Sequence, residues 1–348
     1  MGGDGGAPGA PYHRSSLDPV GRNDRALHLL WEEFVATIRS PTLGADTPTQ
    51  LFSWLEGERE SERFPTLLWR RGPENVPSGF AVMSTLPDGA AEVMHLYLAE
   101  PARSASGLGE LVDALTRRSL PQPIVDIGDW IVGLTESDQR EALEPRGFRH
   151  IRRERLVRPV EVPVRPTSTP DSEVRLRSLD REDRDSVLDV DRKAYENHID
   201  RFSGPFGERE REFAPYVDKV FSGETAGLRL DASSLATAQG RPVGFSFIFD
   251  TDRGPLLGDV SVDPGWRRRG IATAMITRAL ETLRSTGATG EMSLFYTVAN
   301  PTRAGSVYRR LGFHPPSGAP RFVPGLWIRE EYRQRRGFAV ADDEPRDP

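Results

Sequence analysis

The sequence contains no cysteine, which excludes disulfide bonds, thiolate metal ligands and cysteine nucleophiles. Its six histidines are scattered without the spacing typical of metal ligands, so we expect no metal cofactor. Long apolar runs are missing as well, and no stretch approaches the roughly 20 residues that a membrane-spanning helix needs. The opening residues Met1–Gly6 lack the basic and then apolar order of a secretion signal. We therefore expect a cytoplasmic protein without a membrane partner.

An excess of positive charge is also lacking. The 46 Lys and Arg residues are outnumbered by 52 Asp and Glu residues, and the formal net charge of −6 argues against a nucleic-acid partner. The 37% hydrophobic and 28% charged residues are ordinary values for a globular protein. A chain of 348 residues can bury two separate cores. We expect a small-molecule partner and a monomer or homodimer.

Three segments interrupt the globular pattern. Residues 1–16 are rich in Gly, Pro and Ser, and residues 339–348 are acidic and poor in apolar side chains, so both are predicted to be disordered tails. Residues 158–171 carry prolines at short intervals, which block a helix and favour an extended linker. The sequence therefore predicts one domain over 17–157 and a second over 172–338.

The second half alternates helical and strand periodicities in the order helix, helix, hairpin, strand, helix, strand, helix. This order is typical of the α/β class, here with a mixed sheet of parallel and antiparallel strands as in α+β proteins. The expected helices span 180–195, 208–221 and 270–285, and the expected strands span 234–238, 243–250, 256–262 and 294–298.

The segment from Val262 to Ala272 is the most informative one. It leaves a β-branched strand, crosses a turn and begins a helix. The first-turn N–H groups of a helix have no intrahelical acceptor, and the helix dipole adds favourable potential for an anion there. Gly270 lets a bulky ligand approach the backbone, and the arginines at 267–269 supply positive charge. The pattern predicts a phosphate-binding site.

The spacing Arg267-x-x-Gly270-x-Ala272 resembles the acyl-CoA pyrophosphate loop of the GNAT superfamily of N-acyltransferases. The strand at 294–298 and the segment through Tyr308 to Phe313 are similar to the last strand and helix of that superfamily. Two motifs in the family order are more specific than either motif alone. The resemblance implies a GNAT fold, acetyl-CoA as acyl donor and a small-molecule amine as acceptor.

The first half resembles the same fold more weakly, which indicates two tandem GNAT-like domains. Ser104 stands at the place of Arg267, and Leu143 stands at the place of Tyr308. The N-terminal domain is therefore predicted to be a degenerate copy that has lost the acid and most of the charge directed at phosphates. Gly107 and Gly109 leave two alternatives open: a tight start of a packed helix, or a residual ligand site.

The resemblance places acyl-CoA on the loop and on the edge of the strand before it, where backbone groups can pair with the pantetheine amides as a neighbouring strand would. An N–H group near Val262 would polarise the thioester carbonyl. Asn300 either bonds the pantetheine arm or caps a helix, and it precedes Tyr308 by eight positions where the family usually has seven. The predicted acyl-CoA-binding residues are Val260, Val262, Arg267, Arg268, Arg269, Gly270, Ile271, Ala272, Thr273 and Asn300.

Two side chains are predicted to carry the chemistry. Tyr308 matches the tyrosine of the family and is the candidate general acid, because a phenol can protonate a leaving thiolate. Its alternative is a core tyrosine, since Ala304, Tyr308 and Leu311 fall on one helical stripe. Asp259 is the candidate general base, and its alternative is a salt-bridged carboxylate at a sheet edge.

Tyr195, His198 and Phe206 lie between the first two helices of the second half, where this fold usually builds its acceptor pocket. Aromatic packing and exposed loop polarity are the alternatives for these side chains. The predicted activity is N-acyl transfer from acyl-CoA to a small amine. The two-domain layout resembles that of mycothiol synthase, so a mycothiol synthase-like acetyltransferase is one alternative, and a regulatory module that binds acyl-CoA without turnover is another.

Overall fold

The computed structural model describes most of the chain outside its two ends, and the contacts divide it into two compact units, residues 1–148 and 149–348. The tails predicted at 1–16 and 339–348 lie outside the described residues except for Ser16, as do residues 165–171 of the predicted linker. The described ranges are 16–21, 23–38, 65–72, 74–86, 88–119, 123–164, 172–196, 198–201, 209–224, 227–317 and 322–338.

The first unit contains a sheet in the order β1-β2-β3-β4-β5, in which β4 and β5 are parallel and the other neighbours are antiparallel. Helix α1 packs Leu27 and Phe34 against Phe80 and Tyr97 of the sheet. The elements are β1 (Ser16–Val20), α1 (Arg25–Ile38), β2 (Thr66–Arg71), β3 (Val76–Thr85), β4 (Ala91–Leu98), η2 (Glu100–Ala102), α3 (Ala105–Ser119), β5 (Ile124–Gly128), α4 (Glu136–Leu143) and η3 (Glu144–Arg146).

The second unit has the strand order β12-β6-β11-β10-β9-β8-β7, with a parallel pair formed by β10 and β11. Its elements are β6 (Phe148–Pro159), β7 (Val174–Ser178), η4 (Arg181–Asp183), α5 (Arg184–Tyr195), η5 (Ile199–Arg201), α6 (Arg209–Ser222), β8 (Ser234–Ala238), β9 (Arg241–Thr251), β10 (Gly254–Val262), η6 (Pro264–Trp266), α7 (Ile271–Ser285), β11 (Glu291–Thr297), α8 (Ala304–Arg310), β12 (Phe322–Arg329) and α9 (Glu330–Arg335).

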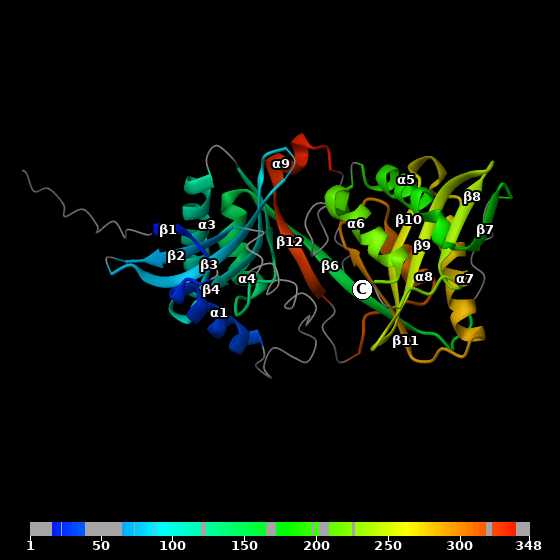
Figure 1. Ribbon diagram of the computed structural model, residues 1–348, viewed down its shortest axis with the longest axis horizontal. Helices are drawn as coiled ribbons and strands as arrows, with labels where there is room; N and C mark the ends of the chain where they lie inside the picture. The colour runs from blue at the N-terminus through cyan, green and yellow to red at the C-terminus, as the bar shows by residue number, and fades with distance from the viewer. Residues whose placement is uncertain are drawn as a thin grey trace, which may run out of the picture. The chain divides into compact units, whose positions relative to one another are not determined.

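Helices cover both faces of the second sheet. Helix α7 buries Met275 and Ala279 against one face, because apolar residues recur along it at helical spacing. Helices α5 and α6 pack on the other face, against Phe245 and Phe247 of β9. Figure 1 shows α5 and α7 on opposite sides of β8, β9 and β10. Each strand between them therefore presents alternate side chains to two different environments.

The mixed α/β class predicted from the sequence is confirmed, since each unit contains a parallel strand pair beside antiparallel ones. In the second half, the predicted helices and strands match α5 to α8 and β8 to β11 with differences of a few residues at their ends. The boundary between the two units lies between residues 148 and 149, whereas the sequence predicts it in the linker 158–171. Strand β6 accounts for this, because it pairs with β11 of the second unit.

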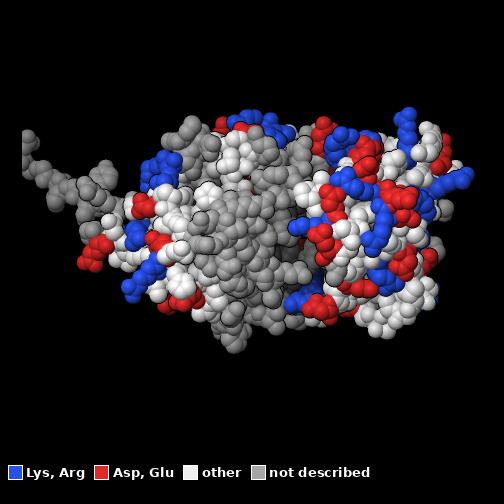
Figure 2. All heavy atoms as spheres, viewed as in Figure 1, with Lys and Arg blue, Asp and Glu red and all other residues white. Residues whose placement is uncertain are grey.

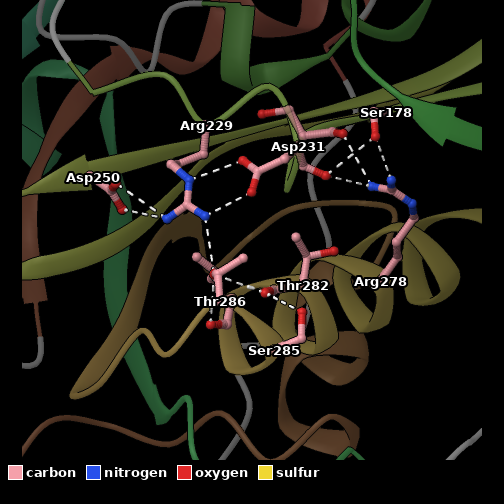
Figure 3. Close-up of polar contacts among 10 residues, drawn as sticks. Ser178, Arg229, Asp231, Asp250, Arg278, Thr282, Ser285 and Thr286 are labelled. Carbon is pink, nitrogen blue, oxygen red and sulfur yellow. Dashed lines mark hydrogen bonds and ion pairs between the residues drawn. The ribbon is translucent and has the colours of Figure 1, made fainter.

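A polar network attaches the end of α7 to the sheet (Figure 3). The Arg229 guanidinium binds both carboxylate oxygens of Asp231, at 3.0 and 2.8 Å, and donates to the Thr286 hydroxyl at 3.2 Å. It also contacts Asp250 of β9 at 3.3 Å. Farther along the helix, Arg278 donates to the Ser178 hydroxyl at 2.7 Å. These contacts hold the middle and the carboxyl-terminal end of α7 and leave its amino terminus for other interactions.

Candidate functional site

The amino terminus of α7 is open. Its N-cap is Gly270, which has a left-handed backbone with φ of 75° and brings no side chain to the first turn. The first intrahelical bond runs from the Ala274 N–H to the Gly270 carbonyl at 2.9 Å. In the described part of the chain, the N–H groups of Ile271, Ala272 and Thr273 have no acceptor. Three amides therefore converge where the sequence predicts a pyrophosphate.

The loop before α7 has an unusual backbone. Arg268 has a φ of 66°, an uncommon value for a residue with a side chain, and Gly270 follows with a second positive φ. Asp263 caps the preceding η6 turn by accepting the Gly265 N–H at 2.8 Å. A positive φ costs free energy in a residue other than glycine, and residues with such backbone conformations cluster at functional sites.

The three loop arginines do not share one role. The sequence predicts that all three bind phosphates, whereas the Arg267 guanidinium is partly buried and bonded within the protein. Its Nε donates to the Val262 carbonyl at 3.2 Å, and its Nη2 donates to the Ala194 carbonyl at 2.8 Å. Arg267 therefore anchors the loop to the end of α5. Arg268 and Arg269 are exposed, and Arg269 lies over the Trp266 ring at 4.5 Å.

Strands β10 and β11 separate just before the loop. They pair at Leu256 opposite Ser293 and at Leu257 opposite Leu294, whereas β10 continues to pair with β9 as far as Val262. The edge of β10 that includes Val260 and Val262 is therefore without a β11 partner over its last residues. Unpaired N–H and carbonyl groups on such an edge are suited to bind an extended chain that carries amides.

A bulge at Gly258 sets the direction of Asp259. The register of β10 against β9 shifts between Leu257 and Asp259. Leu257 packs in the core beneath α7, whereas Asp259 lies opposite Phe247, which faces α5 and α6. In a regular strand Asp259 would share the face of Leu257, two residues earlier, and the bulge turns its carboxylate to the opposite face. Asp259 is partly buried on the predicted acceptor side of the sheet.

Tyr308 occupies α8 and packs against the core beneath α7, with its ring 5.7 Å from that of Tyr296. In the described part of the chain, its hydroxyl makes no hydrogen bond. Burial raises the pKa of Tyr308 well above its usual value near 10, and Tyr195, Asp200 and Asp259 raise it further. The phenol therefore stays protonated at neutral pH, and it shares one electrostatic environment with residues from α5, η5 and β10.

Two predicted site residues, His198 and Asn300, bond to protein groups. His198, which is 6% exposed, accepts the Asp200 N–H at its Nδ1 atom at 3.1 Å, so its Nε2 carries the proton and donates to the Asn300 amide oxygen at 3.3 Å. The Asn300 amide nitrogen donates to Asp200 at 3.0 Å, and its oxygen accepts the Thr302 N–H at 2.9 Å.

This arrangement bears on two predicted roles. Both His198 ring nitrogens bond to protein groups, and the Asn300 amide braces a turn. The roles of these residues toward the acceptor and toward pantetheine stay predictions. Asn300 is not the N-cap of α8, because that position is Arg303. Tyr195 contacts the network through its ring, 5.5 Å from that of His198. The predicted pocket residue Phe206 lies outside the described residues.

Sequence reasoning missed a triad formed by buried Glu154 and Tyr296 with the exposed Arg309 of α8. Glu154 of β6 is 1% exposed; it accepts a hydrogen bond from the Tyr296 hydroxyl and pairs with Arg309 at 2.7 Å. Burial and the Glu154 carboxylate raise the pKa of Tyr296 to about 12. Gly305 lets α8 approach this group, since a Cβ there would lie 2.7 Å from the Tyr296 ring. Glu154 lies 142 positions before Tyr296 in the sequence, so no local spacing predicts their contact.

The first unit repeats the order of elements, but protein groups occupy the start of α3, which corresponds to the start of α7. Arg103, rather than Ser104, takes the place of Arg267, because its Nε donates to the Leu98 carbonyl at 3.2 Å, again five residues back. Ser104 instead accepts the Gly107 N–H at 3.1 Å and so occupies the start of α3. A Cβ at Gly107 would lie 1.9 Å from the Ala102 carbonyl oxygen. These contacts favour the tight helix start over a residual ligand site.

The comparisons with known proteins agree with this geometry. Residues 231–315 match the family model described as an acetyltransferase (GNAT) domain, so the chain contains a GNAT acetyltransferase domain in its second unit. No curated protein matches the chain in sequence.

Solved structures share the two-unit fold. The chain is similar to a GCN5-related N-acetyltransferase from Sphaerobacter thermophilus, with 16% identity, a TM-score of 0.52 and coverage of 90% of this chain and 94% of the other. It is also similar to a tandem GNAT protein from the clavulanic acid biosynthesis pathway, with 12% identity, a TM-score of 0.50 and coverage of 90% and 98%. A glucosamine N-acetyltransferase region of a fungal multi-domain β-N-acetylglucosaminidase has 14% identity, a TM-score of 0.52 and coverage of 92% and 38%.

The tandem GNAT fold predicted from the sequence is therefore confirmed, and a GNAT domain implies acyl transfer from acyl-CoA. Over the described ranges, no helix is long and apolar enough to cross a membrane. Within the same ranges, no group of three or more His, Cys, Asp or Glu side chains is arranged to hold a metal ion.

Proposed function

We propose that the second unit transfers an acetyl or other short acyl group from acyl-CoA to the amine of a small molecule. The observation that carries this proposal is the open start of α7, where three amides without acceptors follow an edge of β10 that β11 has left. A pyrophosphate fits the helix terminus, and the amides of pantetheine fit the strand edge. Arg268 and Arg269 supply exposed positive charge for the outer phosphates.

The reaction forms a C–N bond and breaks the C–S bond of the thioester. Asp259 takes the proton of the attacking amine, directly or through water, on the face that α5 and α6 cover. The backbone near Val262 polarises the thioester carbonyl. Tyr308 gives its proton to the departing thiolate, and its raised pKa supports this role because the acid form persists at neutral pH.

The remaining side chains position these groups. Asp200, held by Asn300 and beside His198, lies in the electrostatic environment of Tyr308 on the acceptor side. Acidic and basic side chains are interspersed over the visible face of the second unit in Figure 2, which favours a small acceptor over a nucleic acid. A mycothiol synthase-like acceptor, a cytoplasmic location and a monomer or homodimer stay predictions.

Replacing Tyr308 by phenylalanine tests the proposal. A single-turnover experiment with labelled acetyl-CoA and a mixture of small amines should show acyl transfer slowed by about 10²- to 10⁴-fold, while the affinity for acetyl-CoA is unchanged. Tyr332→Phe in α9 is the matched control and should retain the wild-type rate. Binding of acetyl-CoA without release of free thiol by the wild-type protein would favour a regulatory module instead.

A further inference from the structure

One face of β6 and β11 carries groups that the proposed chemistry does not use. Leu156 and Leu294 lie opposite each other and point into the core beneath α7. Side chains alternate along a strand, so the neighbouring pair Arg155 and Phe295 points to the opposite face. Asp259 points to that face as well, because of the bulge in β10. Arg155 therefore lies on the acceptor side of the sheet.

The Arg155 guanidinium is partly buried, and within the described ranges no carboxylate pairs with it. In the described ranges it makes no hydrogen bond or ion pair, and its Nε atom is buried without an acceptor. Guanidinium groups at such depth are ordinarily paired with a carboxylate, because an unsatisfied buried donor costs free energy. Arg153, two residues earlier, points to the same face and adds positive charge.

Two neighbours of Arg155 also suit a ligand. Phe295, its partner across the strands, is 41% exposed and offers an apolar surface. Thr297 is 1% exposed, and in the described part of the protein its hydroxyl has no hydrogen-bond partner. A cation, an exposed ring and an unsatisfied hydroxyl on one face of β6 and β11 form a surface that can bind a molecule with an oxyanion at one end and methylene groups beside it.

We propose that Arg155 binds an oxyanion of the acceptor, a carboxylate or a phosphate, while the amine of the same molecule lies near Asp259 and Tyr308. This inference rests on the proposed acyl transfer. Strand β11 separates Arg155 from Asp259, and β10 has already parted from β11 at Asp259, so the two charged ends of the acceptor are at least about 10 Å apart. The planar guanidinium favours such a group because it can donate two parallel hydrogen bonds.

Labelled acetyl-CoA, the full-length protein and a small-molecule extract of the source cells provide the test. We expect labelled products that retain a negative charge on anion exchange, and alkaline phosphatase then distinguishes phosphate esters from carboxylates. Arg155→Gln should reduce formation of these products by about 10- to 100-fold at low acceptor concentration. Arg155→Lys should restore part of the loss, because it returns the charge without the planar fork.

The control variant is Arg241→Gln, an exposed arginine of β9 in the same sheet, which should leave product formation unchanged. Labelled products without an anionic group, or equal product formation by Arg155→Gln and wild type, would overturn the role of Arg155 and leave acyl transfer standing. Acetyl-CoA binding with no labelled product at all would overturn the proposed function, and the inference with it. A circular dichroism melt of each variant confirms that it is folded.

Discussion

Replacing Gly305 by alanine is predicted to displace α8 and to slow acyl transfer. A Cβ at this position would lie 2.7 Å from Cε2 of Tyr296 and 2.8 Å from its Cζ and hydroxyl atoms. Tyr296 has little freedom to retreat, because its hydroxyl is bound to Glu154 and accepts a hydrogen bond from Arg309 at 3.0 Å. The helix that carries Tyr308 must therefore move instead.

The size of the effect follows from this contact. Ordinary van der Waals contacts begin at 3.4 Å, so the helix must shift by about 0.7 Å. Overpacking of this kind typically costs about 1–3 kcal/mol of folding free energy, against about 1 kcal/mol gained when glycine in a helix becomes alanine. A displacement approaching 1 Å at a reacting group lowers the rate by up to about 100-fold. We expect a folded protein, a rate lower by about 10- to 100-fold and an unchanged affinity for acetyl-CoA.

Release of free thiol at saturating acetyl-CoA measures the rate, and urea unfolding measures the stability. Ser306→Ala, at the next and exposed position of α8, is the matched control and should change neither quantity by more than a small amount. If Gly305→Ala retains the rate and the stability of the wild-type protein, the packing of α8 against Tyr296 does not position Tyr308.

Three further predictions test other parts of the molecule. Because burial raises the pKa of Tyr308, the acyl-transfer rate should show no loss from this phenol between pH 7 and 10, and an alkaline limb that disappears in Tyr308→Phe would contradict this. Arg229→Ala removes the paired bonds to Asp231 and should lower the melting temperature by about 2 to 6 °C, whereas Arg241→Ala should not. Burial lowers the pKa of His95 from 6.5 to about 3, so this side chain stays neutral in the folded state, whereas in the unfolded state it takes up a proton as the pH falls below 6.5. Urea unfolding should therefore show that the free energy of unfolding falls by about 2 kcal/mol between pH 7 and pH 5. In His95→Leu this loss of free energy should be smaller by about the same amount.

Local patterns predicted the elements of the second unit well. The helical stripe of α7, the alternation of β9 and β10 and the glycine at 270 are each encoded within a short window, and the corresponding elements form there. The open helix terminus follows from the same window, because a glycine N-cap brings no side chain to cap it. This is why spacing alone could predict an open helix terminus at this position.

Local patterns cannot predict contacts between segments that lie far apart in the sequence. Arg267 looks like a free cation in the sequence, yet the carbonyl of Ala194, seventy-three positions earlier, fixes it. His198 and Asn300 bond to each other across 102 positions, a contact that no local spacing indicates. The register error in the first unit has a local cause: α3 starts two residues after Arg103, whereas α7 starts four residues after Arg267, and glycine spacing alone does not reveal the shorter loop.

Calorimetric titration of the full-length protein with acetyl-CoA tests the central claim most directly. The open start of α7 and the closed start of α3 predict one molecule bound per chain, and Gly270→Val should abolish the heat of binding because it strains the positive φ and fills the helix terminus. A wild-type protein that gives no heat with acetyl-CoA, or a Gly270→Val variant that binds it normally, would contradict the account.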